Sequence, residues 1–574
     1  FGIKQENVKT PMDYTRDELE FNVIDDKENK ETKIIQVLHQ INQDDGVFDL
    51  KGENTQCGII FTPTVNGRSG CYPLAEKLSQ TLNTEVNYYS GSIPKNAGQE
   101  IMRSEQFDLY KKQIQEGFKR NEFSLLTATK AFGMGVNKGN IHYTIHYGIP
   151  GSMESLYQEA GRAGRDKTRF SKKKAQCYVL LSKPRDQSVL NSIWDRSTTL
   201  SELEKLLKNV SGDINSNLFL FLVGQDTIKA EFEIIRKLYR TYARSKLSNV
   251  IVSGNEVAAS KMQVEKGIYR LSQLGIIKDW TIESFFGGGA FEVEFHAFTE
   301  TSIRNSLLKS IRKYDKEFNF ESLVSDGKFS AYKKILTQAP IDYTQIDKDI
   351  LILLQWSYDN FAYNRRQSLK NIYENCALFA DGTINKNEFK RRIENYFKFS
   401  ESTYVLQHIA ENPLDYNRWF EVFYQIENNV VTDNFMTRRQ QESLRDNLSR
   451  FLESYMQNAG LDMISGLLRL MLGDFDNADG KNRLQSSLSQ VAALSEFDKI
   501  QILKQILGIA VNLEDQQKSL LSLELSLYYD SIDELKLIHS TLGGDSILGI
   551  LIEHFNKRIE DINDKLYGEL REVR

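Results

Sequence analysis

The order of apolar and polar positions divides the chain into an alternating part, a mixed part and a long helical part. From residue 30 to about residue 184, short apolar runs bounded by turn residues alternate with stretches in which apolar residues recur at helical spacing. Runs of the first kind are typical of buried parallel strands, and stretches of the second kind are typical of amphipathic helices. The alternation therefore predicts an α/β domain in which helices cover both faces of a parallel sheet.

The expected strands of this sheet are apolar runs at residues 57–64, 86–89, 123–127, 141–147 and 176–181. A further strand-like run, residues 19–23, follows Arg16. Open parallel sheets bind ligands at the carboxyl ends of their strands. We therefore expect the loops that follow Thr127 and Tyr147 to form the ligand-binding edge.

The pattern changes after residue 184. Residues 185–229 are helical and rich in Leu and Phe, which predicts a platform held by apolar packing. Residues 230–300 combine helical patterns with two strand-like runs around the glycine-rich residues 284–289, which is typical of a winged helix. Residues 301–574 are almost wholly helical without a recognisable repeat, which predicts a large all-α region.

Composition narrows the possible function classes. The chain has 574 residues, with 73 Lys and Arg against 78 Asp and Glu, so its net charge of −5 gives no overall basic signature for nucleic acid. A DNA partner would need a local basic track. The four cysteines form no CxxC pair, which indicates neither a zinc site nor a disulfide framework. No apolar run reaches membrane-spanning length and no signal peptide opens the chain, so we expect a soluble cytoplasmic protein without a membrane partner. The abundance of Lys, Asn, Ile, Phe and Tyr points to a bacterial source.

The most distinctive chemistry lies between residues 123 and 165. A helix predicted at the end of this stretch carries Gln158, Arg162 and Arg165 at positions i, i+4 and i+7, so we expect the three side chains on one face, towards the open edge of the sheet. Two guanidiniums beside a neutral amide suit a polyphosphate whose charge grows during transfer. The alternative is an arginine-rich helix face that is only solvated.

The loop before this helix follows an apolar strand and carries Thr127, Thr129, Gly133 and Gly135. Glycines let a backbone approach a ligand closely, and hydroxyl and free N–H groups can hold sugar-phosphate oxygens. His142 and His146 lie at i, i+4 spacing on one expected strand. For this pair, packing on the face of the strand is favoured over a metal site.

The strings TATKAFGMGVNK and YQEAGRAGRD, which contain these residues, resemble motifs V and VI of the RecQ family of superfamily 2 DNA helicases. The resemblance implies that residues 30–184 are a second RecA-like lobe and that residues 1–29 link it to a first lobe. Such motors use a GxxxxGK[ST] loop and a DExH box to hold phosphates and Mg²⁺. This chain contains neither string, so we expect ATP and Mg²⁺ to be held mainly by a first lobe outside it, and the segment alone to be inactive.

The resemblance also implies roles for single residues. Arg165 would be the arginine finger, and Arg162 and Gln158 would sense the γ-phosphate. The expected nucleotide-binding set is Gln158, Arg162, Arg165, Gly135 and Asn137. The expected DNA-binding set of the lobe is Arg68, Thr127, Thr129, Lys130 and Gly133.

Family members often carry a zinc platform after the motor and a winged helix with an aromatic hairpin tip. Residues 201–225 hold no cysteine, so we expect no zinc. Phe285 and Phe286 at the expected tip either wedge a duplex through base stacking, worth roughly 1–3 kcal/mol per base, or fold back onto a neighbouring domain. Lys261, Lys266 and Arg270 on the preceding helix either meet DNA phosphates or form a solvated face.

The resemblance therefore implies the C-terminal part of an ATP-dependent 3′-to-5′ DNA helicase that associates with the nucleoid. The alternative is a non-catalytic DNA- or protein-binding adaptor that retains a helicase lobe. In either case DNA is an expected partner, and the helical region from residue 301 is a candidate site for a protein partner. The pathway (repair, recombination or defence against foreign DNA) stays open.

Overall fold

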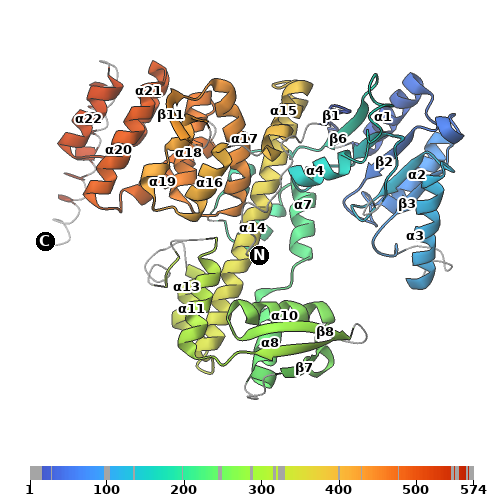
Figure 1. Ribbon diagram of the computed structural model, residues 1–574, viewed down its shortest axis with the longest axis horizontal. Coiled ribbons are helices and arrows are strands. Elements are labelled where there is room, and N and C mark those ends of the chain that lie inside the picture. Colours follow the sequence, from blue (N-terminus) through green and yellow to red (C-terminus); the bar gives the residue numbers. More distant parts are fainter. Residues whose placement is uncertain are drawn as a thin grey trace. The chain divides into compact units, whose positions relative to one another are not determined.

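The computed structural model forms two compact units, Phe1–Ile311 with Phe318–Phe397, and Arg312–Glu317 with Lys398–Arg574 (Figure 1). The residues it describes are 16–27, 29–95, 104–132, 136–196, 198–243, 249–284, 289–314, 318–320, 330–398, 401–427, 430–475, 478–543 and parts of 548–567.

A six-stranded parallel sheet with the order β1-β6-β5-β2-β4-β3 organises the first unit. Its strands are β1 (Leu19–Asp25), β2 (Cys57–Phe61), β3 (Val86–Tyr89), β4 (Leu125–Ala128), β5 (Ile141–His146) and β6 (Ala175–Leu181). The expected parallel sheet is confirmed. The run after Arg16, expected as part of a linker, pairs with β6 along its whole length and forms one edge of the sheet.

Alternate side chains of the strands supply two hydrophobic cores, one on each face of the sheet. On one face, Ile60 packs with helices α1 (Lys30–Asp45), α2 (Cys71–Leu82) and α3 (Ser104–Lys119). On the other face, Ile59 belongs to the core that includes α4 (Met153–Ala160). Burial on both faces explains why β2 reads as a continuous apolar run.

The second face of the sheet is also covered by a helical platform. Its members are α5 (Val189–Trp194), α6 (Leu200–Leu207), α7 (Gly212–Val223), α14 (Gln345–Ala380) and α15 (Lys386–Phe397). The sequence places the start of a separate helical region at residue 301, whereas in the structure the first unit continues through α15. Helical periodicity shows that α14 is amphipathic but not which neighbour its apolar side chains meet.

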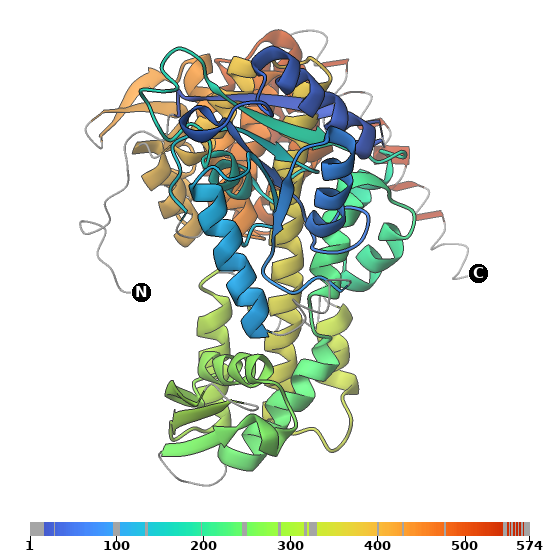
Figure 2. The same cartoon turned by 90° about the vertical axis from the view of Figure 1, so that its right-hand side faces the viewer.

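A three-stranded antiparallel sheet with the order β7-β9-β8 forms a further part of the first unit. It consists of β7 (Asn249–Ser253), β8 (Ile277–Ser284) and β9 (Ala290–Phe295), and it shares a core with α8 (Ile228–Leu238), α10 (Lys261–Gln273), α11 (Glu300–Ile311) and α13 (Ser330–Gln338). The sequence predicted β8 and β9 but not β7. The long helix α14 passes from this core to the core beneath the parallel sheet (Figure 2).

The second unit is mainly helical around one core. Its helices are α16 (Glu401–Glu411), α17 (Arg438–Ser454), α18 (Ala459–Leu472), α19 (Ala478–Val491), α20 (Glu496–Ala510), α21 (Asp515–Ser526) and α22 (Ile532–Leu542). The all-helical expectation is wrong at one place, because β10 (Tyr424–Glu427) and β11 (Val430–Phe435) form an antiparallel hairpin. Within the described residues of both units, no helix has the length and apolar character that crossing a bilayer requires.

Candidate nucleotide and nucleic-acid interface

The predicted arginines lie at the amino edge of the parallel sheet, not at its carboxyl edge. Helix α4 begins after the carboxyl end of β5, runs back along the sheet and ends at Ala160. The turn beyond it returns to the start of β5, where the N–H of Gly164 donates to the carbonyl of Ile141 at 3.2 Å. The expectation that the guanidiniums face the open carboxyl edge is therefore wrong.

The expectation that Gln158, Arg162 and Arg165 share one helix face is also wrong, because α4 stops before both arginines. Gly164 has a φ of +65°, and a Cβ there would lie 3.0 Å from Cδ2 of Leu19. The helix has ended by then, with Gly161 as its C-cap, and the left-handed conformation of Gly164, which favours glycine, keeps the chain from continuing as helix towards Arg165. Gln158 is exposed in the last turn of the helix.

Arg165 is held by neutral groups of the loop that precedes β5. Its Nη1 donates to the carbonyl of Val136 and to Oδ1 of Asn137, both at 3.1 Å. Burial lowers the pKa of Arg165, and the nearby guanidinium of Arg16 lowers it further. An arginine stays charged after such a shift. The structure thus brings Arg165 and Asn137 together, while Gly135 lies outside the described residues.

Arg162 lies half-buried in the same turn. Burial lowers its pKa, the charge of Arg165 adds to this effect, and Glu159 opposes it. Glu159 in turn lies 3.2 Å from Nε2 of His146. The turn therefore carries two neighbouring guanidiniums, and the carboxylate of Glu159 in the last turn of α4 lies near that of Arg162.

The two histidines of β5 pack on the face of the sheet, as the sequence interpretation favoured. The ring of His142 contacts Phe170 with 4.8 Å between centroids, and His146 stacks on Phe61 at 5.5 Å. Burial lowers the pKa of His142 to about 4, so its ring is neutral at pH 7. Among the residues that the structure describes, no group of three or more His, Cys, Asp or Glu side chains could hold a metal ion.

The carboxyl edge brings together the loops that follow β2, β3 and β4. The N–H of Thr62 donates to the carbonyl of Ala128 at 2.8 Å, and that of Thr129 donates to the carbonyl of Tyr89 at 3.1 Å. Oδ1 of Asn66 accepts a hydrogen bond from the N–H of Lys95 at 2.8 Å. These bonds fix the three loops side by side.

Three exposed cations, Arg68, Lys95 and Lys130, stand on these loops. Arg68 forms an ion pair with Glu31 at 3.4 Å, and its side chain remains 82% exposed. Such a pair in solvent is weak and easily exchanged. Sequence reasoning missed Lys95, which could have been found from its place just after the expected strand at 86–89.

Thr127 is not available to a ligand. Its side chain is fully buried, and its hydroxyl donates to the carbonyl of Cys71 at 2.8 Å. The prediction of a DNA contact is wrong here because Thr127 belongs to strand β4 and not to the loop after it. Thr129 lies at the edge but is 9% exposed, and Gly133 lies outside the described residues.

The segment from Thr129 to Asn140 crosses from one edge of the sheet to the other without a helix in its described residues. It begins at the loops of the carboxyl edge and ends before β5, beside Arg165. Phe132 and Val136 anchor it in the core, and Nζ of Lys138 donates to the carbonyl of Lys119 at 3.2 Å. The two edges are thus joined by one short connection that is packed at both of its ends.

The predicted phosphate contacts on α10 have different outcomes. Arg270 is buried, with its Nε 2.9 Å from Oε1 of Glu231 and its Nη1 donating to Oγ of Ser357, so its assignment to DNA is wrong. Lys266 is partly exposed and pairs with Asp226 at 3.0 Å. Lys261 is the first residue of the helix and is partly exposed. Phe285 and Phe286 lie outside the described residues.

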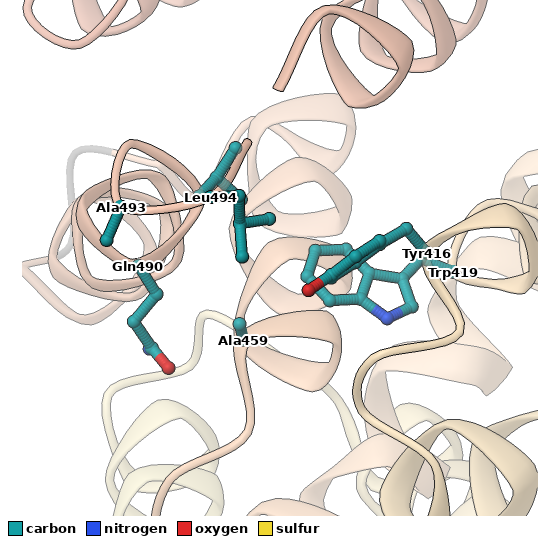
Figure 3. Close-up of a pocket in the computed structure, with 7 residues that line it drawn as sticks. Tyr416, Trp419, Ala459, Gln490, Ala493 and Leu494 are labelled. Carbon is teal, nitrogen blue, oxygen red and sulfur yellow. The ribbon is translucent and has the colours of Figure 1, made fainter. Parts of the chain in front are cut away.

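A cavity of about 270 Å³ lies in the second unit. Its walls are formed by Tyr416, Trp419, Ala459, Gln490, Val491, Ala493 and Leu494 (Figure 3). The indole N–H of Trp419 already donates to the carbonyl of Pro413 at 3.1 Å. Since none of these walls carries a cation, the cavity offers nothing that would hold a polyphosphate.

Comparison with known proteins finds relatives for part of the chain. Residues 32–167 match the model of the helicase conserved C-terminal domain. The ATP-dependent DNA helicase RecQ of Haemophilus influenzae is 48% identical over 120 residues, which is 21% of this chain and 16% of that protein. RecQ of Bacillus subtilis is 30% identical over 183 residues, which is 32% of this chain and 27% of that protein.

A mouse relative, the bifunctional 3′-5′ exonuclease/ATP-dependent helicase WRN, is 41% identical over 102 residues, or 17% of this chain and 7% of that protein. The chain therefore spans only a minor part of the length of these relatives. A solved structure, Mss116p DEAD-box helicase domain 2 bound to an RNA duplex, aligns with 44% of this chain and 83% of its own at 16% identity, with a TM-score of 0.21. The matched segment of this chain is a RecQ-like, superfamily 2 helicase segment.

Proposed function

We propose that this RecQ-like segment is the second motor lobe and C-terminal part of an ATP-dependent DNA helicase that moves 3′ to 5′. The observation that carries the proposal is the division of cations between the edges of one sheet. Half-buried Arg162 and exposed Arg165, which two hydrogen bonds fix in place, lie at the amino edge, and exposed cations on three loops lie at the carboxyl edge. The segment from Thr129 to Asn140 connects them.

The amino edge is suited to a triphosphate held between this lobe and a first lobe supplied by the rest of the protein. Both groups to which Arg165 donates are neutral, so its charge remains available to an anion. A guanidinium already positioned in a partly dry site stabilises the charge that develops on a transferring phosphoryl group. Arg165 would be the arginine finger, with Arg162 and Gln158 as neighbours that respond to the γ-phosphate. Mg²⁺ would be held by the first lobe.

The carboxyl edge is suited to a DNA backbone. Successive phosphates of a DNA strand are best contacted by cations that can adjust their position and by free N–H groups. A single rigid arrangement is not required. Arg68, Lys95 and Lys130 are such cations because they stand in solvent on loops that are themselves tied together. Closure of the two lobes on ATP at the amino edge would then change the DNA contacts at the carboxyl edge through the segment between Thr129 and Asn140.

The small antiparallel sheet with α8 and α10 would act as a winged helix beside the motor. Strands β8 and β9 form its hairpin, and the expected aromatic tip, Phe285 and Phe286, would stack on the bases of an opening duplex. Lys261 and Lys266 would contact the duplex backbone, whereas buried Arg270 would hold the domain together.

The test is the variant Arg165→Ala in the full-length protein. Loss of an arginine finger lowers phosphoryl-transfer rates by about 10³- to 10⁵-fold, so DNA-stimulated ATP hydrolysis should fall by that order while DNA affinity is retained. Arg169→Ala is the matched control, because Arg169 is an exposed cation of the same loop whose Nε lies 3.9 Å from a carboxylate oxygen of Asp166. Unchanged turnover in Arg165→Ala would remove Arg165 from the arginine-finger role, whereas a full-length protein that hydrolyses no ATP with or without DNA would favour the adaptor function.

A further inference from the structure

Arg16 lies shortly before β1 and reaches the turn that carries the two arginines. Its Nη1 donates to the carbonyl of Gly161 at 3.3 Å, and its Nη2 lies 3.0 Å from the carbonyl of Ala163 and 3.4 Å from that of Gly164. Its Nε faces Oε2 of Glu18, also at 3.4 Å. With its side chain only 26% exposed, Arg16 is a built-in part of this turn.

The turn needs such a partner because it follows a helix end. The last carbonyls of a helix and of the residues beyond it have no helical donor and carry partial negative charge. The three carbonyls that Arg16 binds bracket Arg162 and directly precede Arg165. A planar guanidinium can bind several acceptors in one fixed geometry, which a lysine ammonium cannot do.

We propose that Arg16 is a positioning residue that fixes the turn from Gly161 to Arg165 and thereby aims the guanidinium of Arg165. This inference rests on the proposed function in assigning a catalytic consequence, but the structural role stands on the contacts alone. Arg16 contacts three backbone carbonyls and the carboxylate of Glu18, none of which is a reacting group. Its effect on turnover is therefore exerted through Arg165.

The position of Arg16 is itself tied to the platform. Asp17, the next residue, lies 3.4 Å from Nζ of Lys390 on α15, and Glu20 on β1 pairs with Lys386 of the same helix at 2.5 Å. These exposed pairs are weak on their own, so the segment that leads into β1 is held mainly by the pairing of β1 with β6 and by the contacts of Arg16 with the arginine turn. A displacement of the segment that leads into β1 would move Arg16 and, through its hydrogen bonds, the turn that carries Arg165.

The first test uses amide hydrogen exchange on the 574-residue chain. Arg16→Ala should speed exchange of the amides of Arg162, Ala163 and Gly164, while amides inside β5 keep their protection. Arg169→Ala, which removes a cation of the same loop, should leave both sets unchanged. Unaltered exchange at Arg162–Gly164 in a folded Arg16→Ala protein would overturn the proposal.

The second test uses the full-length protein and DNA-stimulated ATP hydrolysis. Because displacement of a catalytic group by about 1 Å costs up to about 100-fold, Arg16→Ala should lower kcat by between about 10- and 100-fold with a much smaller change in KM for ATP. Arg16→Lys keeps the positive charge but lacks the planar guanidinium that binds several carbonyls at once. Its kcat should therefore stay well below that of the wild type. Full activity in Arg16→Lys would show that charge and not position matters, and would overturn the proposal.

A double variant separates this inference from the proposed function. If Arg16 acts only through Arg165, Arg16→Ala combined with Arg165→Ala should turn over no more slowly than Arg165→Ala alone. A further loss of about tenfold would contradict the inference. If Arg165→Ala alone kept full turnover, the arginine-finger role in the proposed function would fail, and the exchange experiment would still decide whether Arg16 holds the turn.

Discussion

At the amino edge of the parallel sheet the exposed side chain of Arg165 is fixed by hydrogen bonds to a carbonyl and an amide, whereas at the carboxyl edge Arg68 is 82% exposed with a weak ion pair. A guanidinium that is already fixed in place, like that of Arg165, needs little reorganisation to stabilise negative charge that develops at one point of a bound ligand. An exposed cation with a weak ion pair, like Arg68, can instead follow a phosphate backbone that moves along the surface. The difference teaches that one sheet holds its cations in two ways, fixed at one edge and free in solvent at the other, and the proposed function assigns a different phosphate ligand to each.

Among substitutions that leave both arginines of the turn in place, the largest effect is expected from Gly164→Ala. The substitution forces a Cβ onto a residue with φ of +65° and to within 3.1 Å of Cβ of Glu18, so the turn must move. In the full-length protein this should lower DNA-stimulated ATP turnover by about 100-fold. Single-stranded DNA affinity should change little, because the substitution lies at the other edge. Fluorescence anisotropy with a labelled oligonucleotide provides that second measurement, and an equal fall in DNA affinity would count against separate edges.

The carboxyl edge is tested by the triple variant Arg68→Ala, Lys95→Ala and Lys130→Ala, which removes these three exposed cations. Removal of one phosphate-binding cation should reduce the slope of log affinity against log salt by about 0.7 for a single strand, so the triple variant should lower the slope by about two and the affinity by roughly tenfold. ATP turnover at saturating DNA should be retained. A salt titration of oligonucleotide binding measures the slope, and an unchanged slope would remove these side chains from the DNA path.

Thr127→Val tests whether Thr127 supports the fold and not the DNA contact. The substitution removes a buried hydroxyl that donates to Cys71 and leaves that carbonyl without this donor, so the free energy of unfolding should fall by about 1–2 kcal/mol. DNA affinity should equal that of the wild type. Urea unfolding and oligonucleotide binding provide the two readouts, and weakened DNA binding in a stable Thr127→Val protein would restore Thr127 to the interface.

The smallest effect concerns pH. Since burial lowers the pKa of His142 to about 4 from its usual 6.5, folding favours the neutral ring, and the stability that this neutral ring provides is lost as the pH falls below the unfolded value towards the folded one. Allowing for partial exposure, acidification from pH 7 to pH 5 should cost the wild type about 1 kcal/mol more than His142→Phe. Parallel urea titrations at the two pH values measure this difference, and identical losses would contradict it.

The strands of the lobe were predictable from sequence because burial on both faces gives continuous apolar runs such as Cys57–Phe61. The turn after α4 was not, because the motif spacing suggested a continuous helix and only the glycines at 161 and 164 hinted at its end. The buried state of Thr127 and Arg270 depends on which carbonyl or carboxylate the fold brings near, Cys71 or Glu231. Local pattern does not contain such long-range contacts.

The most direct test of separate nucleotide and DNA edges is amide exchange of the full-length protein with a non-hydrolysable ATP analogue alone and with single-stranded DNA alone. We predict that the nucleotide protects Val136–Asn137 and Gly161–Arg165, while DNA protects Asn66–Gly70 and Thr129–Phe132. Protection of the same segments by both ligands, or the reverse assignment, would contradict the division of the sheet into two phosphate-binding edges.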